Sequence, residues 1–227
     1  MSIQEKIESV NPKPLARRPH LVAVPLPALH PAAASRAKRG LDLFIAIAAL
    51  ILLSPVMAVI ALLIALDSRG PVFFRQTRTG LNGVHFDILK FRTMSVCENG
   101  ERIEQAHKND PRVTRLGRVL RRASLDELPQ LINVISGEMS LIGPRPHALA
   151  HDRHYTRLIE NYALRQRVKP GISGWAQVNG HRGETPALED MRARVEHDLW
   201  YVHHQSFALD AKILFRTFFE IVRSKAW

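Results

Sequence analysis

The sequence predicts a mostly helical α/β protein with a small β-hairpin, held at a membrane by a re-entrant helix-break-helix and by interfacial amphipathic helices. Three observations lead to this fold class: an apolar run over Leu43–Leu66 with a proline in its middle, an Asn-Gly turn between two strand patterns, and several amphipathic segments after it. We therefore expect three regions: a disordered Pro-rich cytosolic leader over 1–35, a re-entrant membrane helix over 36–69 and a cytosolic domain with interfacial helices over 70–227.

The leader is expected to lack a fixed structure. Residues 1–35 hold six of the 14 prolines of the chain and show little hydrophobic periodicity. No function is assigned to this segment.

The apolar run contains no charged residue over its 24 positions. As a straight helix it would reach about 36 Å, enough to cross a hydrocarbon core of about 30 Å. Ser54-Pro55 interrupts it, and a proline inside a helix removes a backbone hydrogen bond and kinks or breaks the helix. Each half reaches only about the bilayer midplane, so the run is either a kinked span or a wedge that returns to the side it came from.

The flanking charges favour the wedge. Lysine and arginine beside membrane segments prefer the cytosolic side. A helical hairpin keeps both basic flanks on that side, whereas a single span would place one of them on the opposite side of the membrane. A buried helix in a soluble core is the alternative, but such helices rarely stay apolar on every face for this length. The flanking residues are Arg36, Lys38 and Arg39 before the run and Arg69, Arg75 and Arg78 after it.

Composition restricts the partners. The net charge of +11 suits acidic lipid headgroups or phosphorylated substrates. The chain has only three Trp and three Tyr, and no basic segment is interleaved with aromatic residues. It therefore offers no surface on which nucleic-acid bases would stack, and no nucleic acid is expected as a partner. The single cysteine, Cys97, excludes an internal disulfide framework and fits a reducing compartment.

A β-hairpin is predicted directly after the membrane segment. Val72–Arg78 and Val84–Arg92 read as strands, and Asn82-Gly83 between them is a strong hairpin signal. Its basic side chains are explained more simply by a solvated strand edge than by a binding site.

The remaining chain is predicted to be mainly helical. The last helix carries an apolar stripe that suits either the membrane interface or docking into the core. We expect a polar loop or short helix over 95–110, helices over 112–122, 125–135, 148–168, 188–203 and 207–225, and a strand over 172–178.

Two adjacent carboxylates, Asp126 and Glu127, follow a pair of arginines at a predicted helix start. Ser124 and Glu127 have the spacing of a capping box, which is the structural alternative to catalysis. The surrounding arginines nevertheless form a field suited to phosphate, since guanidinium groups bind phosphate oxygens in bidentate fashion. Attack of a carboxylate on a phosphate diester needs a divalent cation, and Mg²⁺ held by one or two carboxylates and the substrate phosphates is the usual solution.

Other nucleotide chemistries are not indicated. The chain has no P-loop and no GxGxxG motif, so it resembles neither a nucleoside triphosphatase nor a Rossmann dehydrogenase.

An ordered set of motifs runs along the chain: Lys38-Arg39 with Asp42, Ser54-Pro55, Lys90-Phe91-Arg92-Thr93-Met94, Ser124-Leu125-Asp126-Glu127-Leu128-Pro129-Gln130 and Gly143-Pro144-Arg145-Pro146. This set resembles the bacterial sugar transferase family of monotopic polyprenyl-phosphate phosphoglycosyl transferases, and the resemblance covers about residues 36–227. The segments 169–180 and 182–185 are similar to its undecaprenyl-phosphate glucose phosphotransferase branch. Larger members of that branch carry further N-terminal domains, so we expect the core present here to be self-sufficient.

The resemblance implies transfer of a sugar 1-phosphate from a UDP-sugar to undecaprenyl phosphate, with release of UMP, as the first step of exopolysaccharide or capsule synthesis. Asp126 would be the nucleophile that forms a covalent phosphosugar, and Glu127 would either hold Mg²⁺ or deprotonate the lipid phosphate. The implied place is the bacterial inner membrane, with the catalytic domain on the cytosolic face and inner-membrane lipids as partners. The implied substrate-binding residues are Lys90, Arg92, Arg121, Arg122, Arg145 and His147.

Several alternatives stay open at this point. The glucose-branch motifs favour UDP-glucose, but UDP-galactose differs in the orientation of one hydroxyl group. A basic membrane scaffold without catalysis and a metal-dependent phosphohydrolase are the competing function classes. A homo-oligomer is compatible with the sequence, which does not fix the oligomeric state.

Overall fold

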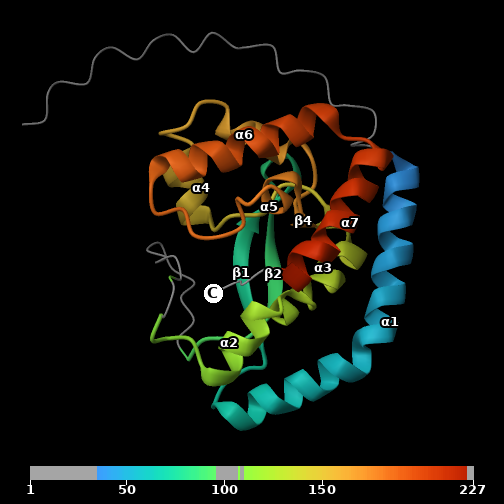
Figure 1. The fold of residues 1–227 in the computed structure, drawn as a ribbon, viewed down its shortest axis with the longest axis vertical. Helices are drawn as coiled ribbons and strands as arrows, with labels where there is room; N and C mark the ends of the chain where they lie inside the picture. The colour runs from blue at the N-terminus through green and yellow to red at the C-terminus, as the bar shows by residue number, and fades with distance from the viewer. Residues whose placement is uncertain (1–34, 96–106, 108–109, 224–227) are drawn as a thin grey trace, which may run out of the picture.

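The structure, a computed structural model, describes residues 35–95, 107 and 110–223 (Figure 1). The predicted leader up to residue 34 and most of the predicted polar loop lie outside the described residues. The elements in chain order are α1 (Arg36–Asp67), β1 (Phe73–Thr79), the 3₁₀ turn η3 (Leu81–Gly83), β2 (His85–Phe91), α2 (Arg115–Arg122), η4 (Leu125–Glu127), α3 (Gln130–Ser136), β3 (Ser140–Ile142), α4 (Leu149–Tyr155), η5 (Tyr162–Arg167), β4 (Gly171–Ser173), α5 (Trp175–Val178), α6 (Leu188–His204) and α7 (Phe207–Arg223).

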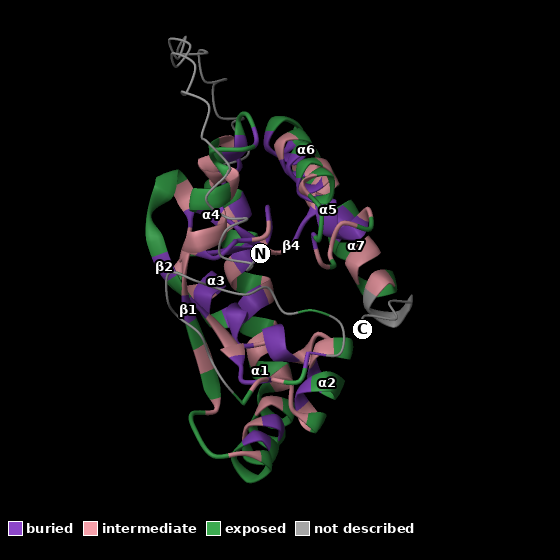
Figure 2. Ribbon diagram, turned by 90° about the vertical axis from the view of Figure 1, so that its left-hand side faces the viewer, coloured by how far each residue is buried: buried purple, intermediate pink, exposed green. Residues whose placement is uncertain are grey.

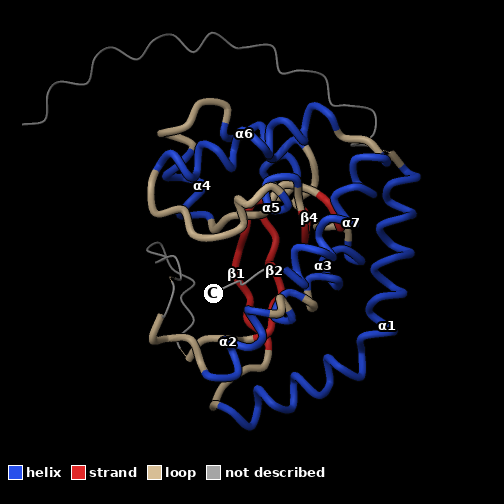
Figure 3. The backbone as a smooth tube through the Cα atoms, in the orientation of Figure 1, coloured by secondary structure: helices blue, strands red, loops and turns tan. Residues whose placement is uncertain are grey.

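The predicted hairpin and the mostly helical fold class are confirmed. Strands β1 and β2 pair antiparallel, from Phe73 opposite Phe91 to Thr79 opposite His85. Figure 3 shows the two strands of this hairpin side by side, and Figure 2 shows them along one side of the molecule. At the turn, φ is 53° at Asn82 and 82° at Gly83, the positive values that favour an Asn-Gly pair.

A second, parallel pair of short strands was not predicted. Ser140 of β3 lies opposite Gly171 of β4, so the paired residues are 31 positions apart in the chain. The strand predicted over 172–178 is wrong beyond residue 173, because the chain turns there into α5. A Cβ atom at Gly174 would lie 2.3 Å from the carbonyl oxygen of Gly143, so the close passage of these two segments requires glycine.

Two predicted helices need correction. The helix expected over 125–135 starts as η4, and α3 begins only at Gln130, directly after Pro129. The long helix expected over 148–168 is wrong: α4 ends at Tyr155, Asn161 adopts a left-handed φ of 60°, and η5 follows. Long-range contacts of η5 override local propensity here, as its Arg165 is buried and forms an ion pair with Asp198 of α6.

Helix α1 bends sharply in its middle without losing its helical path, as Figure 1 shows. Pro55 has no N–H to donate to the carbonyl of Ile51, four residues earlier. The hydroxyl of Ser54 donates to that same carbonyl at 2.8 Å. The Ser-Pro pair therefore bends the helix while leaving no orphaned carbonyl, which matters most where no water is available.

Both arms of α1 pack on the same domain. Ala46 of the first arm belongs to a core cluster with Val134 of α3, and Ile64 of the second arm packs with Phe91 and Leu120. Elsewhere the helix is open: Leu52 is 78% exposed, and Figure 2 shows the outer turns of α1 as largely exposed. Among the described helices only α1 is long and apolar enough to cross a membrane, and only 11% of its most apolar window is buried, unlike a soluble core helix.

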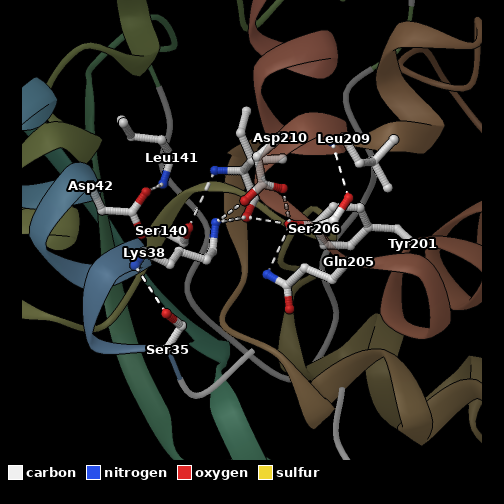
Figure 4. A network of polar contacts seen from close by, with 11 residues as sticks. Ser35, Lys38, Asp42, Ser140, Leu141, Tyr201, Gln205, Ser206, Leu209 and Asp210 are labelled. Atoms are coloured by element: carbon white, nitrogen blue, oxygen red, sulfur yellow. Dashed lines mark hydrogen bonds and ion pairs between the residues drawn. The ribbon is translucent and has the colours of Figure 1, made fainter. Parts of the chain in front are cut away.

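A buried polar network fixes the N-terminal end of α1 (Figure 4). The Lys38 ammonium group lies 2.6 Å from the Asp210 carboxylate of α7, and the Tyr201 hydroxyl of α6 donates to the same carboxylate at 2.7 Å. One turn later, the Asp42 carboxylate accepts from the Ser140 hydroxyl at 2.8 Å. These contacts attach α1 directly to α7 and β3, and through the Asp210 carboxylate to α6.

Arg92 fixes the C-terminal end of α1. Its guanidinium group, which follows β2, donates to the carbonyl oxygens of Ser68 at 2.6 Å, Arg69 at 3.1 Å and Ile64 at 3.4 Å. The last carbonyls of a helix have no partner inside the helix, and a cation also complements the negative end of its dipole. The side chain therefore caps α1.

Helix α7 exposes an aromatic face. Phe215, Phe218 and Phe219 are 66%, 67% and 51% exposed, while Ile213 on the other side is fully buried. This pattern is typical of a helix that lies in a membrane interface and also docks on its domain. The interfacial position of α7 stays a prediction.

Replacing Arg92 by glutamine should destabilise the protein by about 2 kcal/mol, because hydrogen bonds to a charged group at a buried helix end are lost. Arg75→Gln is the matched control, since Arg75 lies on the same hairpin and is exposed. Thermal unfolding of both variants in detergent micelles measures the difference. Equal shifts in the two variants would contradict the capping role.

Candidate active site

The two carboxylates of the candidate site lie on η4, in the tight connection between α2 and α3. Ser124 begins this turn with a left-handed φ of 58°. Asp126 and Glu127 are only 8% and 7% exposed. The Ser124 side chain forms no cap, so the capping box considered as an alternative does not exist.

Glu127 is paired with two cations. Its Oε1 lies 2.8 Å from the Lys90 ammonium group of β2 and 2.5 Å from Arg145, whose second nitrogen donates to Oε2 at 3.2 Å. Burial alone would raise the pKa of Glu127, but the charges of Arg145 and Lys90 outweigh it and hold that pKa well below its usual range. The side chain is therefore a permanent anion that joins η4 to the hairpin and to the loop before α4.

Asp126 is buried but unpaired. Among the described residues its carboxylate forms no hydrogen bond and no ion pair. Burial raises its pKa, and the neighbouring Glu127 charge raises it further, whereas Lys90 and Arg121 oppose the shift. Two adjacent carboxylates whose environments push their pKa values apart are a known sign of distinct chemical roles.

Only some of the basic residues predicted to bind substrate lie near the two carboxylates. Lys90 and Arg145 meet at Glu127, and the Arg121 side chain of α2 is held by the Thr93 hydroxyl at 2.9 Å while its charge acts on Asp126. Arg122 is exposed at the end of α2 and pairs with neither carboxylate. Arg92 caps α1, and its predicted contact with diphosphate oxygens stays a prediction.

His147 lies in a buried network behind Arg145. Its Nδ1 is 2.6 Å from the Tyr162 hydroxyl and 3.1 Å from the Arg165 guanidinium, which also donates to the Arg145 carbonyl at 2.7 Å. Burial and the nearby arginines lower the pKa of His147 well below its usual range, so the ring is neutral. These contacts position the loop that carries Arg145, and substrate contact by His147 stays a prediction.

Three further arginines approach the site. Arg182 donates to the Ser124 hydroxyl, and burial together with the Arg145 charge lowers the pKa values of Arg78 and Arg194 to about 10. Arg78 is one of the basic residues that flank the apolar run, and Arg182 lies in the segment 182–185 that resembles the glucose branch, but nothing in the local sequence distinguishes Arg194. Cations held close together without enough carboxylates to pair them are suited to a polyanionic ligand.

The donor set fits a hard cation such as Mg²⁺. The described residues contain no group of three or more His, Cys, Asp or Glu side chains that could hold a metal alone. Mg²⁺, however, is commonly bound by one or two carboxylates plus substrate phosphates. Within the described part of the chain the Asp126 oxygens are unengaged and Oε2 of Glu127 accepts a single hydrogen bond.

Buried carboxylates among cations, on a domain docked to a bent apolar helix, are an arrangement suited to phosphate chemistry beside a membrane. Comparison with known families agrees: the family model described as bacterial sugar transferase matches residues 33–224. The chain belongs to this family, whose resemblance the motifs had indicated.

The chain is similar to several characterised proteins. A protein from Escherichia coli (strain K12) named UDP-glucose:undecaprenyl-phosphate glucose-1-phosphate transferase is 55% identical over 189 residues, which are 83% of this chain and 41% of the relative. A Rhizobium leguminosarum bv. phaseoli protein named exopolysaccharide production protein PSS is 44% identical, with 84% of this chain and 98% of the relative covered.

Another relative differs in the named sugar. A protein from Aeromonas hydrophila, named UDP-N-acetylgalactosamine-undecaprenyl-phosphate N-acetylgalactosaminephosphotransferase, is 46% identical, with 79% of this chain and 42% of the relative covered. This chain thus spans about two fifths of the length of the E. coli and Aeromonas proteins.

Proposed function

We propose that the chain transfers hexose 1-phosphate, with glucose as the favoured sugar, from a UDP-sugar to undecaprenyl phosphate and releases UMP. The observation that carries the proposal is the unequal carboxylate pair, with Glu127 paired to Lys90 and Arg145 and Asp126 unpaired beside it. Membership of the bacterial sugar transferase family and the names of the relatives support the reaction class and both substrates.

The first step is attack by an Asp126 carboxylate oxygen on the phosphorus that bears the hexose. A bond forms between that oxygen and phosphorus, and the bond from phosphorus to the bridging oxygen breaks, so UMP leaves with the electron pair. In the second step, a phosphate oxygen of undecaprenyl phosphate attacks the same phosphorus and releases the Asp126 carboxylate. Burial without a partner suits the nucleophile, because hydrogen bonds and hydration would weaken a carboxylate oxygen as an attacking group.

Glu127 serves better as a charge-bearing ligand than as a base. Its lowered pKa makes it a weak proton acceptor near neutral pH. Asp126 and Glu127 would hold Mg²⁺ together with substrate phosphate oxygens, and the cation would neutralise charge on the transferring phosphoryl group. Lys90, Arg121 and Arg145 would bind the phosphate oxygens and orient them for in-line displacement.

The membrane helix is proposed to be re-entrant, with the domain on the cytosolic face of the bacterial inner membrane. Its two arms pack on one domain, and the exposed side of α1 and the phenylalanines of α7 would contact lipid. This arrangement would hold η4 near the headgroups, where a lipid phosphate and a soluble sugar nucleotide both arrive.

Replacing Asp126 by asparagine should abolish UMP release, with a loss of at least about a thousandfold, because the amide cannot form the phosphosugar ester. UMP release from UDP-glucose, with and without undecaprenyl phosphate, measures the effect, and radiolabelled glucose should be trapped on the wild-type protein when the lipid is omitted. Glu138→Gln, which changes an exposed carboxylate on the α3–β3 connection, is the control.

Native turnover in Asp126→Asn would contradict the nucleophile and favour a membrane scaffold or another acid. Release of free glucose 1-phosphate without lipid would instead identify a phosphohydrolase.

Topology gives a separate prediction. Single cysteines introduced at Arg36 and at Arg69, in a chain whose Cys97 is replaced by serine, should both be labelled by an impermeant thiol reagent only from the cytosolic side. Inside-out and right-side-out membrane vesicles allow the comparison. Labelling of the two positions from opposite sides would establish a simple span and exclude the re-entrant helix.

A further inference from the structure

A pocket of about 150 Å³ is bounded by Glu127 of the carboxylate pair. Ser124 and Glu127 of the η4 region form one part of its wall, and Ser173 of β4, Gln177 of α5 and Thr217 of α7 form another. Asp126 does not line it, and neither do Lys90, Arg121 and Arg145, the cations assigned to phosphate in the proposed reaction. The pocket therefore adjoins the proposed phosphate site at Glu127 without being that site.

One residue of the pocket wall, Gln177, carries a buried acceptor without a partner. Gln177 is 8% exposed, and its amide nitrogen donates to the Ile172 carbonyl at 3.2 Å, but among the described residues no donor reaches its Oε1. A buried polar atom left without a partner costs about 1–3 kcal/mol. A ligand with a hydroxyl or N–H group would remove that penalty, whereas an isoprenoid chain has no donor to offer.

Other polar groups lie beside apolar walls. The hydroxyls of Ser173 and Thr217 are 2.6 Å apart, and Arg182 reaches the pocket at its Ser124 side. The walls between them are apolar, formed by Leu128, Leu131, Ile172 and Val178. A hexose has the matching surface, with hydroxyl groups around its edge and C–H groups on its faces.

The geometry of the proposed displacement places the sugar beside the line that joins the attacking and leaving groups. In an in-line displacement the attacking Asp126 oxygen and the leaving UMP lie at opposite ends of the phosphorus. The lipid phosphate must later attack from the end that UMP has left. The hexose oxygen stays bonded to phosphorus at an equatorial position in both steps, so the sugar ring lies lateral to Asp126, where a pocket bounded by Glu127 can receive it.

We propose that this pocket holds the hexose of the sugar nucleotide and that Gln177 and Thr217 select it through its hydroxyl groups. The inference rests on the proposed function and adds the residues that determine its sugar specificity.

The test uses the full chain in detergent with undecaprenyl phosphate as acceptor. The specificity constant for UMP release is measured with UDP-glucose, UDP-galactose and the monodeoxy analogues of UDP-glucose, for the wild type, Gln177→Met and Thr217→Val. Gln177→Met should lower kcat/KM for UDP-glucose about tenfold and should erase the wild-type preference over one deoxy analogue, because the acceptor that reads that hydroxyl is gone. The KM for undecaprenyl phosphate should not change.

Gln205→Met is the matched control. Gln205 is 1% exposed and its Oε1 also lacks a partner among the described residues, but it does not line this pocket. Its replacement should leave the pattern across the deoxy analogues as in the wild type. Thr217→Val removes a hydroxyl with little change in shape. It provides a second measurement of sugar discrimination should Gln177→Met fail to fold.

Two outcomes overturn the inference. Unchanged discrimination in both pocket variants excludes a sugar-reading role, and a raised KM for undecaprenyl phosphate alone assigns the pocket to the lipid. Failure of the proposed function is distinct, since the wild type would then release no UMP from any UDP-hexose.

Discussion

The ion pairs of Glu127 are the interaction on which the rest of the site depends. A buried carboxylate must be compensated, and here Lys90 of the hairpin and Arg145 of the loop before α4 both approach the same side chain. Two segments that are distant from η4 in the chain are thereby held against it. The same arrangement leaves Asp126 buried beside them, without a partner among the described residues. One carboxylate stabilises the site, and the other is left for chemistry.

The membrane helix acts on this site through its two ends. Lys38 and Asp42 join its first turns to α7, α6 and β3, and Arg92 caps its last turn from the residue that follows β2. Because Lys90 lies two residues before Arg92, the cap of the membrane helix and the partner of Glu127 share one short segment. The bend at Ser54-Pro55 makes it possible for both arms to reach the domain, so the shape of α1 and the placement of η4 are linked.

Sequence reasoning succeeded where the signal is local. The Asn82-Gly83 turn, the apolar run with its proline and the adjacent carboxylates all carry their information within a few residues, and the structure has each of them. It failed where distant contacts decide. The helix expected over 148–168 stops because η5 is drawn into an ion pair with α6, and the strand expected after residue 171 ends where Gly174 passes Gly143. The cap formed by Arg92 and the approach of Arg194 could not be foreseen, since their partners lie elsewhere in the sequence.

Thermal unfolding of Asp126→Asn and Glu127→Gln near neutral pH tests most directly whether the two carboxylates contribute to stability in opposite directions. The folded-state pKa of Asp126 is raised, so its ionised form opposes folding above that pKa, and the neutral amide should stabilise the protein. The pKa of Glu127 is lowered, so its charge contributes stability above the unfolded value, and Glu127→Gln should lose about 3 kcal/mol. A higher midpoint for Asp126→Asn and a lower one for Glu127→Gln are predicted. Equal destabilisation by both would make Asp126 a structural carboxylate and contradict this account.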